Sequence, residues 1–254
     1  MIPLFTSHYS ISRAIITLDE ATEIKDNSPV SIFSIAEKYN IDPIFVVDNN
    51  FSGFIEAYEN SRKIKKQLVF GLKLVVCDDI EKKDEESFIT ESKVIVFLKN
   101  SAAYSDAVKI YSKAATDGFY YIPRIDWKRL NELWTDNLLL AVPFYDSFLY
   151  NNTLTYKCSI VPKFEKMRPV FFTSETGLPF DGLVRDVVKQ YTADNGYELL
   201  ESHNINYFKD SDIEAYQVFR CIGRRSNLQK PQLNAFSSCG FSFESYLKKV
   251  GKNL

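Results

Sequence analysis

Few side chains in this sequence could bind a metal ion or carry out acid–base chemistry. The chain contains only two histidines, His8 and His203, among 254 residues, against 33 aspartates and glutamates. A metal cluster built on several histidines cannot be assembled from this inventory. Asp48, Asp146, Glu175 and His203 each follow a predicted strand, and together they could form one catalytic site that holds manganese or zinc. The alternative is that they are ordinary loop side chains, because nothing in their spacing brings them to one point.

Other common kinds of site are not indicated. The nine glycines have neither the spacing of a dinucleotide-binding fingerprint nor that of a P-loop. Cys77, Cys158, Cys221 and Cys239 form no Cys-x-x-Cys pair, which disfavours a zinc ribbon or a redox motif and is typical of reduced thiols. No 18-residue apolar stretch occurs, and the first residues lack the basic region of a signal peptide. We therefore expect a cytoplasmic protein without membrane contact, located in the host cytoplasm if the gene is viral.

The elements that must position these side chains follow from the apolar pattern. Short apolar runs alternate with segments of helical period, which is typical of a parallel α/β fold. The predicted strands lie near 2–6 and at 44–47, 68–76, 94–98, 138–142, 170–173 and 198–201. The predicted helices lie at 32–39, 54–66, 103–114, 183–191 and 213–222, with another ending at 130–134, and the charged run 78–86 is predicted to be a solvated loop. About seven strands joined by helical crossovers favour a distorted (β/α)7 barrel, formed by a single domain over residues 1–254. A doubly wound open sheet is the alternative.

In such a barrel the chemistry lies where the strands end at their carboxyl side. Asparagine and lysine dominate the polar residues at these ends, which are Asp48, Asn49, Asn50, Lys73, Lys99, Asn100, Asp146, Glu175, His203, Asn204 and Asn206. Neutral amides bind metals weakly, and an ammonium group has no lone pair to offer. This rim is therefore polar but poorly equipped for metal catalysis.

Several segments resemble motifs of one family, in the same order along the chain. Residues 118–126, Gly-Phe-Tyr-Tyr-Ile-Pro-Arg-Ile-Asp, resemble a stretch of the form GFYYxPRID. Residues 7–10 resemble H-x-H-S-x-Y-S, and residues 47–58 resemble T-D-H-G-N-x-x-G-x-x-x-x-Y. Residues 202–207 and 212–216 resemble T-N-D-V-H-Y followed by D-x-E-A-H. These motifs are those of the PHP (polymerase and histidinol phosphatase) family, as in the N-terminal domain of the bacterial DNA polymerase III α subunit, and the resemblance covers nearly the whole chain.

The departures from these motifs bear on activity. Active members of the family hold two or three metal ions on histidines and carboxylates. The corresponding positions here are Leu4, Thr6, Asp48, Asn49, Lys73, Asn204, Asn206 and Tyr216. Only Asp48 keeps a ligand type, and Lys73 puts a cation where cations would bind. The resemblance therefore implies that the metal site is lost, with no catalytic residue, metal or cofactor. Lys73 either pairs with Asp48 in place of the metals or is an exposed lysine.

The same resemblance implies a binding role in DNA replication. In the bacterial replicase the corresponding domain, itself often metal-free, serves as a docking surface for the proofreading exonuclease. We therefore expect a catalytically inactive PHP-like domain, standing alone rather than fused to a polymerase. It would act as an accessory or modulator that docks to a polymerase, an exonuclease or another replisome subunit, and its Asn-, Lys-, Ile-, Tyr- and Phe-rich composition points weakly to a phage genome. The alternatives are a metal-dependent phosphoesterase or 3′–5′ exonuclease with a rearranged metal site, and self-assembly into an oligomer.

Contact with nucleic acid would have to be local, because the formal net charge is −2. The aromatic residues of the segment 119–127 with Arg124 could stack on a single strand, or they could be part of the core and of a turn. Arg224, Arg225 and Lys230 could contact phosphate, or they could form a solvated turn.

Overall fold

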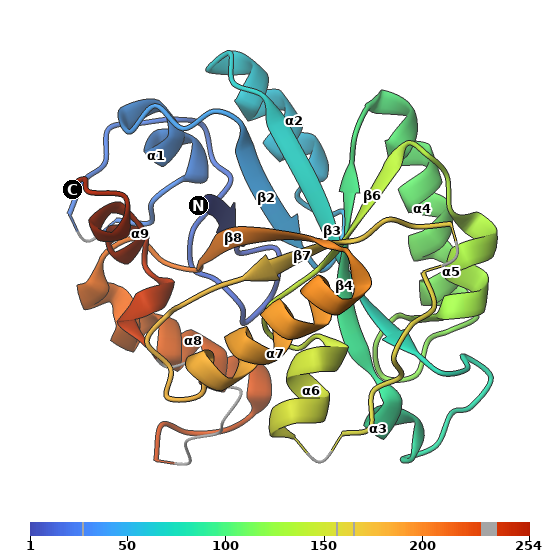
Figure 1. Cartoon of the computed structure of the whole chain (residues 1–254). Coiled ribbons are helices and arrows are strands. Elements are labelled where there is room, and N and C mark those ends of the chain that lie inside the picture. Colours follow the sequence, from blue (N-terminus) through green and yellow to red (C-terminus); the bar gives the residue numbers. More distant parts are fainter. Residues whose placement is uncertain (27, 156, 165, 230–237) are drawn as a thin grey trace. The chain divides into compact units, whose positions relative to one another are not determined.

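The computed structural model describes residues 1–254 except residues 27, 156, 165 and 230–237 (Figure 1). Its strands are β1 (Ile2–Phe5), β2 (Ile44–Asp48), β3 (Leu68–Cys77), β4 (Ser92–Leu98), β5 (Arg124–Asp126), β6 (Leu138–Val142), β7 (Val170–Thr173) and β8 (Glu198–Ile205). Its helices are α1 (Ile32–Lys38), α2 (Phe54–Lys63), α3 (Ser87–Thr90), α4 (Ser101–Thr116), α5 (Trp127–Leu133), α6 (Phe148–Leu154), α7 (Asp181–Asn195), α8 (Ile213–Arg224) and α9 (Phe243–Lys249). In the predicted basic patch, Lys230 and the side chain of Arg224 lie outside the described residues.

The strands form a closed α/β barrel. Their hydrogen-bonded order is β2-β1-β8-β7-β6-β4-β3, and an additional pairing of β2 with β3 closes these seven strands into a ring. Strand β5 pairs in parallel with β3 and is not part of the ring. The predicted α/β class and seven-stranded barrel are thus confirmed.

Strand β4 departs from the parallel pattern that the sequence indicates. This strand is antiparallel to both of its neighbours, β3 and β6. A parallel return needs a crossover of a dozen or more residues, usually containing a full helix. The charged segment after β3 contains only the four-residue helix α3, so the chain turns back beside β3 instead of crossing over.

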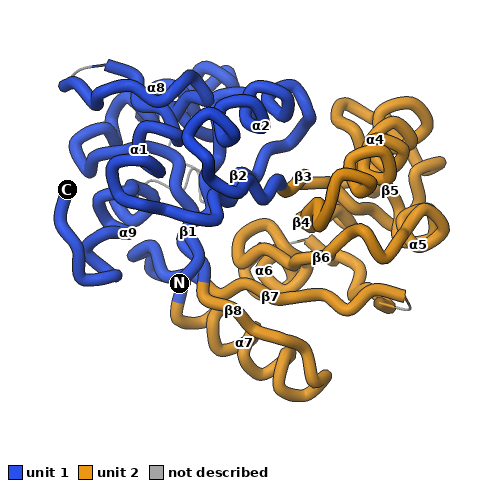
Figure 2. Tube along the Cα trace, turned by 90° about the horizontal axis from the view of Figure 1, so that it is seen from above, with its two compact units in different colours: residues 1–70, 174–181, 202–254 blue, residues 71–173, 182–201 orange. Residues whose placement is uncertain are grey.

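The chain divides into two compact units (Figure 2). Unit 1 comprises residues 1–70, 174–181 and 202–254, and unit 2 comprises residues 71–173 and 182–201. Two of the boundaries fall within strands β3 and β8, so each of these strands contributes to both units. The expectation of a single domain over residues 1–254 stays a prediction. No helix formed by the described residues is long and apolar enough to cross a membrane.

In unit 1, helices α1 and α9 each begin at a serine cap. Helix α1 starts at Ser31, whose hydroxyl accepts a hydrogen bond from the backbone N–H of Phe33. The first five residues of the helix, 32–36, are buried, and four of them are apolar. Helix α9 starts in the same way at Ser242, and its buried Phe243 stacks on Phe5 of β1 with ring centroids 6.0 Å apart. These contacts hold the carboxyl end of the chain against the first strand.

Unit 2 packs α4 against β4 and β5. The side-chain oxygen of Asn100 caps α4 by accepting from the backbone N–H of Ala103. Ala103, Ala107, Ile110 and Ala114 are all fully buried, at spacings of three and four residues. This is the buried face that the sequence predicted.

Candidate functional site

Asp48 ends strand β2 and is the most completely enclosed carboxylate of unit 1, with no exposed surface. Its Oδ1 accepts hydrogen bonds from the backbone N–H of Ser7 at 2.9 Å and from the hydroxyl of Ser10 at 2.7 Å. Its Oδ2 accepts from the hydroxyl of Ser7 at 2.6 Å. Both carboxylate oxygens therefore bind donors from the loop that follows β1.

The register of the first two strands explains this arrangement. Strands β1 and β2 are parallel neighbours in which Phe5 lies opposite Val46. Ser7 and Asp48 each lie two residues further on, so they come to the same level and the same face at the carboxyl ends of the strands. The carboxylate–hydroxyl contact follows from that register.

The two serines are held by further hydrogen bonds. The hydroxyl oxygen of Ser7 accepts from the backbone N–H of Tyr9 at 3.2 Å, and that of Ser10 accepts from the backbone N–H of Asn49 at 3.0 Å. Each hydroxyl thus accepts one bond from the main chain and donates one to Asp48. The group is a closed network of buried or half-buried polar atoms, in which Asp48 provides the only charge.

Burial and hydrogen bonding act on Asp48 in opposite directions. Burial raises the pKa of the carboxyl, whereas the hydrogen bonds from Ser7 and Ser10 and the neighbouring His8 lower it, and the net direction is upward. The hydrogen bonds stabilise the ionised form, but only enough to offset part of the cost of removing it from water.

A second polar contact in unit 1 lies after β8. The side-chain amide of Asn206 donates to the hydroxyl of Tyr216 at 3.2 Å. Tyr216 is fully buried, and burial raises the pKa of its phenol. The guanidinium of Arg220 lies 5.7 Å from the centre of this ring. A neutral amide–phenol pair thus occupies this part of the unit.

The comparisons with known proteins decide the family. The sequence model of the PHP domain matches residues 5–149, which is more than half of the chain. The chain belongs to the PHP family.

Its relatives include DNA polymerase III alpha subunits, of which it matches a small part. It is 24% identical over 216 residues to the DNA polymerase III subunit alpha of Borreliella burgdorferi, covering 81% of this chain and 18% of that protein. It is 30% identical over 100 residues to the same subunit of Chlamydia trachomatis, covering 38% of this chain and 8% of that protein. It is 23% identical over 159 residues to the same subunit of Treponema pallidum, covering 60% of this chain and 14% of that protein.

The residues at the PHP metal positions do not fit a cluster of divalent ions. Leu4 is apolar and buried on β1, directly opposite Asn204 of β8. Thr6, Asn49 and Asn204 offer neutral oxygens, and Asp48 already accepts three hydrogen bonds. Among the described residues, no group of three or more histidine, cysteine, aspartate or glutamate side chains could hold a metal ion. Divalent cations in such sites depend on several anionic or imidazole ligands at close range.

The four residues of the predicted rearranged site have different surroundings. Asp146 lies in unit 2, where its carboxylate binds the ammonium of Lys93 at 2.6 Å. Glu175 is exposed in unit 1, and its backbone carbonyl accepts from Lys249. His203 is fully buried on β8, where burial and the charge of Lys249 lower its pKa to about 4. Because Asp146 belongs to the other unit, a site made of all four residues, including Asp48, stays a prediction.

Lys73 lies within β3, half-buried between the buried residues Leu72 and Leu74. It belongs to unit 2, whereas Asp48 belongs to unit 1. The predicted ion pair between Lys73 and Asp48 therefore also stays a prediction.

Sequence reasoning identified Asp48 but missed the partners that hold it. Ser7 and Ser10 stood within a recognised motif, yet their hydroxyls were given no role. The signal was present, because two hydroxyl residues three positions apart directly after a strand can both reach one carboxylate at the end of the neighbouring parallel strand.

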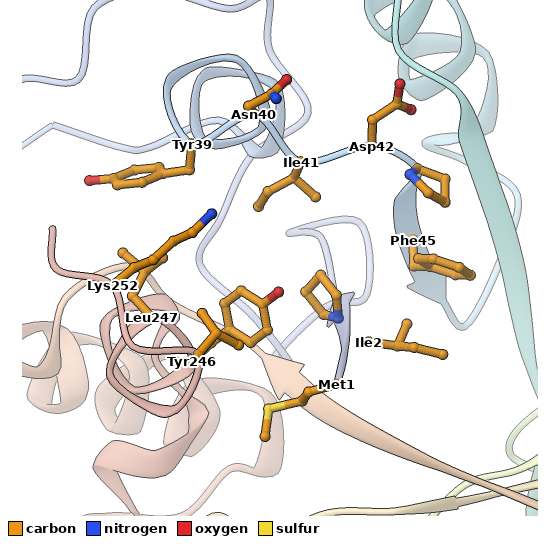
Figure 3. A pocket seen from close by; sticks show the side chains of 13 residues that line it. Met1, Ile2, Tyr39, Asn40, Ile41, Asp42, Phe45, Tyr246, Leu247 and Lys252 are labelled. Carbon is orange, nitrogen blue, oxygen red and sulfur yellow. The ribbon is translucent and has the colours of Figure 1, made fainter.

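A pocket of about 310 Å³ in unit 1 lies away from these positions (Figure 3). It is lined by the amino ends of β1 and β2, by the turn before β2 and by α9, through residues that include Ile2, Pro3, Tyr39, Asp42 and Tyr246. Asp48, in contrast, is the last residue of β2, at the carboxyl end of the strand. The pocket is therefore at the opposite ends of β1 and β2 from Asp48.

Proposed function

We propose that the chain is a catalytically silent PHP domain that binds a replication protein in the cytoplasm. The partner would be a DNA polymerase, its proofreading exonuclease or another subunit of the replisome. The observation that carries this proposal is the state of Asp48, because the only carboxylate at the family's metal positions is buried and bound by two serine hydroxyls and a backbone N–H.

The residues around Asp48 are poorly suited to catalysis by bound metal ions. Metal-dependent phosphoester hydrolysis needs bound cations that polarise the phosphoryl group and activate a water molecule. A metal at Asp48 would have to displace two hydroxyl donors and find its other ligands among neutral amides, a threonine and a leucine. The network around Asp48 instead gives the carboxylate the hydrogen bonds that it needs as a buried structural group.

Sequence similarity to polymerase subunits supports a replication partner. The matched relatives are DNA polymerase III alpha subunits, and the resemblance lies in a domain that in those enzymes accompanies the polymerase. A domain that has lost its ligands while keeping its barrel is expected to be retained for a surface rather than for chemistry.

The test measures binding and hydrolysis on the same preparation. Immobilised full-length protein is exposed to purified DNA polymerase III alpha subunit and to its proofreading exonuclease, while hydrolysis of p-nitrophenyl phosphate and of a labelled oligonucleotide is followed with Mn²⁺ or Zn²⁺. We expect saturable binding of at least one subunit and no metal-dependent hydrolysis. Hydrolysis that is lost in Asp48→Asn, without subunit binding, would overturn the proposal in favour of a phosphoesterase or 3′–5′ exonuclease.

Self-assembly is distinguished by light scattering on the same sample. A concentration-independent monomer mass is expected. A stable oligomer that binds neither subunit would contradict the docking role.

A further inference from the structure

Unit 2 exposes a group of large apolar side chains around one tight turn. Tyr121 is 76% exposed, Phe119 50% and Ile122 41%, and Ile89 of the short helix α3 is 44% exposed. Phe88 joins the two segments, because its ring lies 5.9 Å from that of Tyr121. These five residues, Phe88, Ile89, Phe119, Tyr121 and Ile122, are called the aromatic patch below.

A buried arginine holds the patch together. Arg124 has no exposed surface, and its guanidinium donates to the hydroxyl of Ser87 at 2.8 Å and to the backbone carbonyl of Lys82 at 3.0 Å. The same guanidinium lies 5.0 Å from the centre of the Tyr120 ring. Gly118 begins the turn where a Cβ atom would overlap the carbonyl oxygen of Arg124. Arg124 thus ties the loop after β3, helix α3 and the aromatic turn into one local structure.

The residue at the tip of the turn, Tyr121, has a strained backbone conformation and an exposed side chain. Tyr121 has a φ of 60°, in the left-handed region that a bulky residue rarely adopts. The turn is closed by the backbone N–H of Tyr120, which donates to the carbonyl of Ile122 at 3.1 Å. Glycine or asparagine would adopt this conformation at lower cost, yet the position carries a ring that is three-quarters exposed.

The charge beside the patch is negative. Residues 78–86 contain six carboxylates and two lysines, a net charge of −4 at neutral pH. Asp84 and Glu85 lie near enough to Tyr120 for their charges to help raise the pKa of its phenol, after the effect of burial. Among the described residues, no basic side chain forms an ion pair with Glu85 or Glu86.

Exposed apolar side chains next to an acidic loop favour one class of partner. Large aromatic side chains supply most of the binding energy of protein interfaces, and complementary charge sets the orientation and the encounter rate. A phosphate backbone would be repelled by the acidic loop, and Arg124 is buried and fully engaged, so stacking on nucleic acid is disfavoured.

We propose that the aromatic patch, flanked by Asp84, Glu85 and Glu86, is a docking site for a basic segment of a partner protein that carries large apolar side chains. The inference rests on the proposed function, since it names the surface through which this PHP domain would bind its partner. The segment would place apolar side chains against Tyr121 and Phe119 and its arginines or lysines against the acidic loop.

The variants change side chains of the patch and of the acidic loop and leave the hydrogen bonds of Arg124 to Ser87 and Lys82 in place. Tyr121→Gly removes the ring and relieves the left-handed strain, and Phe119→Ser removes the second anchor. Glu85→Lys combined with Glu86→Lys reverses the charge. The matched control combines Ile55→Ser with Glu59→Lys, because both residues are exposed on α2 of unit 1.

The probes are two fluorescent peptides and one oligonucleotide, titrated into the full-length protein. The first peptide has 12 residues, in which arginine alternates with leucine and tryptophan. The second peptide has glutamate in place of each arginine. The oligonucleotide is an oligothymidylate of 12 nucleotides. We expect the basic peptide alone to bind, with affinity reduced about tenfold or more by Tyr121→Gly and by the charge reversal, and unchanged in the control. Equal affinity in all variants, or patch-dependent binding of the oligonucleotide, would overturn the proposal.

The same variants separate this inference from the proposed function. If a polymerase III subunit binds the wild type and all patch variants equally, the docking site is wrong and the replication role stands. If the subunits do not bind but the basic peptide binds through the patch, the docking site stands and the replication role is wrong.

Discussion

Removing one hydroxyl tests whether Asp48 is a structural anchor. In Ser7→Ala, Oδ2 of Asp48 loses its donor at 2.6 Å, and the backbone N–H of Tyr9 loses its acceptor at 3.2 Å. Ser7 and Asp48 both have no exposed surface, so water cannot readily replace the lost hydroxyl. The variant therefore leaves a buried charge less well solvated.

The magnitude follows from the two contacts. A hydrogen bond to a charged group is worth about 1.5–3 kcal/mol, and the half-buried N–H of Tyr9 adds less than about 1 kcal/mol. Ser7→Ala should therefore lower the free energy of unfolding by about 2–3 kcal/mol. In the Asp48→Asn background the same substitution should cost only about 1 kcal/mol, because a neutral acceptor makes a weaker bond.

The assay is urea unfolding followed by far-ultraviolet circular dichroism. This signal reports on both units, whereas Trp127 and Trp134 both lie in unit 2 and would not report on the loop of Ser7. Ser52→Ala is the control, because Ser52 is exposed, and it should change stability by less than about 0.5 kcal/mol. A cost for Ser7→Ala as small as that of the control, or equal costs in both backgrounds, would refute the structural role of the network.

Three further outcomes follow from other contacts. The pKa of His203 is about 4 in the folded protein and about 6.5 in the unfolded chain. As the pH falls, the histidine is therefore protonated in the unfolded chain before it is protonated in the folded protein, and stability should fall between about pH 6.5 and pH 4. Between pH 7 and pH 5 this loss is about 2 kcal/mol, and His203→Gln should remove it from a urea-unfolding series over that range. Gly118→Ala should cost about 3 kcal/mol, since its Cβ would overlap the carbonyl oxygen of Arg124, and an unchanged unfolding midpoint would contradict this. Tyr216→Phe should cost about 1–2 kcal/mol by leaving the buried amide of Asn206 without its partner, and hydrogen exchange in unit 1 should rise accordingly.

Sequence periodicity predicted the strands well where apolar runs are bounded by polar residues. The range 138–142 matches β6 and 170–173 matches β7. The helix with alanine and isoleucine spaced along one face, 103–114, is observed as the core of α4. Burial of a continuous run or of one helix face is a local property, so local patterns reveal it.

Elements that depend on distant partners were missed. Strand β5, residues 124–126, is only three residues long and exists because β3 offers it a parallel edge. Strand β8 extends to Ile205, beyond the predicted end at residue 201, because its second half pairs with β1. The direction of β4 was misjudged because strand direction depends on the connection rather than on the strand's own residues.

At the candidate site, too, local features could be predicted from the sequence, whereas features that depend on the pairing of distant strands could not. The residue types at Asn49, Lys73, Asn204 and Asn206 are readable directly from the sequence, and the loss of the metal site that they imply stays a prediction. The network around Asp48 was not readable in this way, because it depends on the register between β1 and β2.

Metal content shows whether this domain has lost its metal site. The full-length protein and the variants Asp48→Ala and Asp48→Asn would be purified without chelator, incubated with Mn²⁺ and Zn²⁺, freed of unbound ions and measured by inductively coupled plasma mass spectrometry. The arrangement of Asp48 with Ser7 and Ser10 predicts far less than one ion per chain in all three proteins. One or more ions held by the wild type and lost in both variants would show that the metal site is retained and would favour a metal-dependent enzyme.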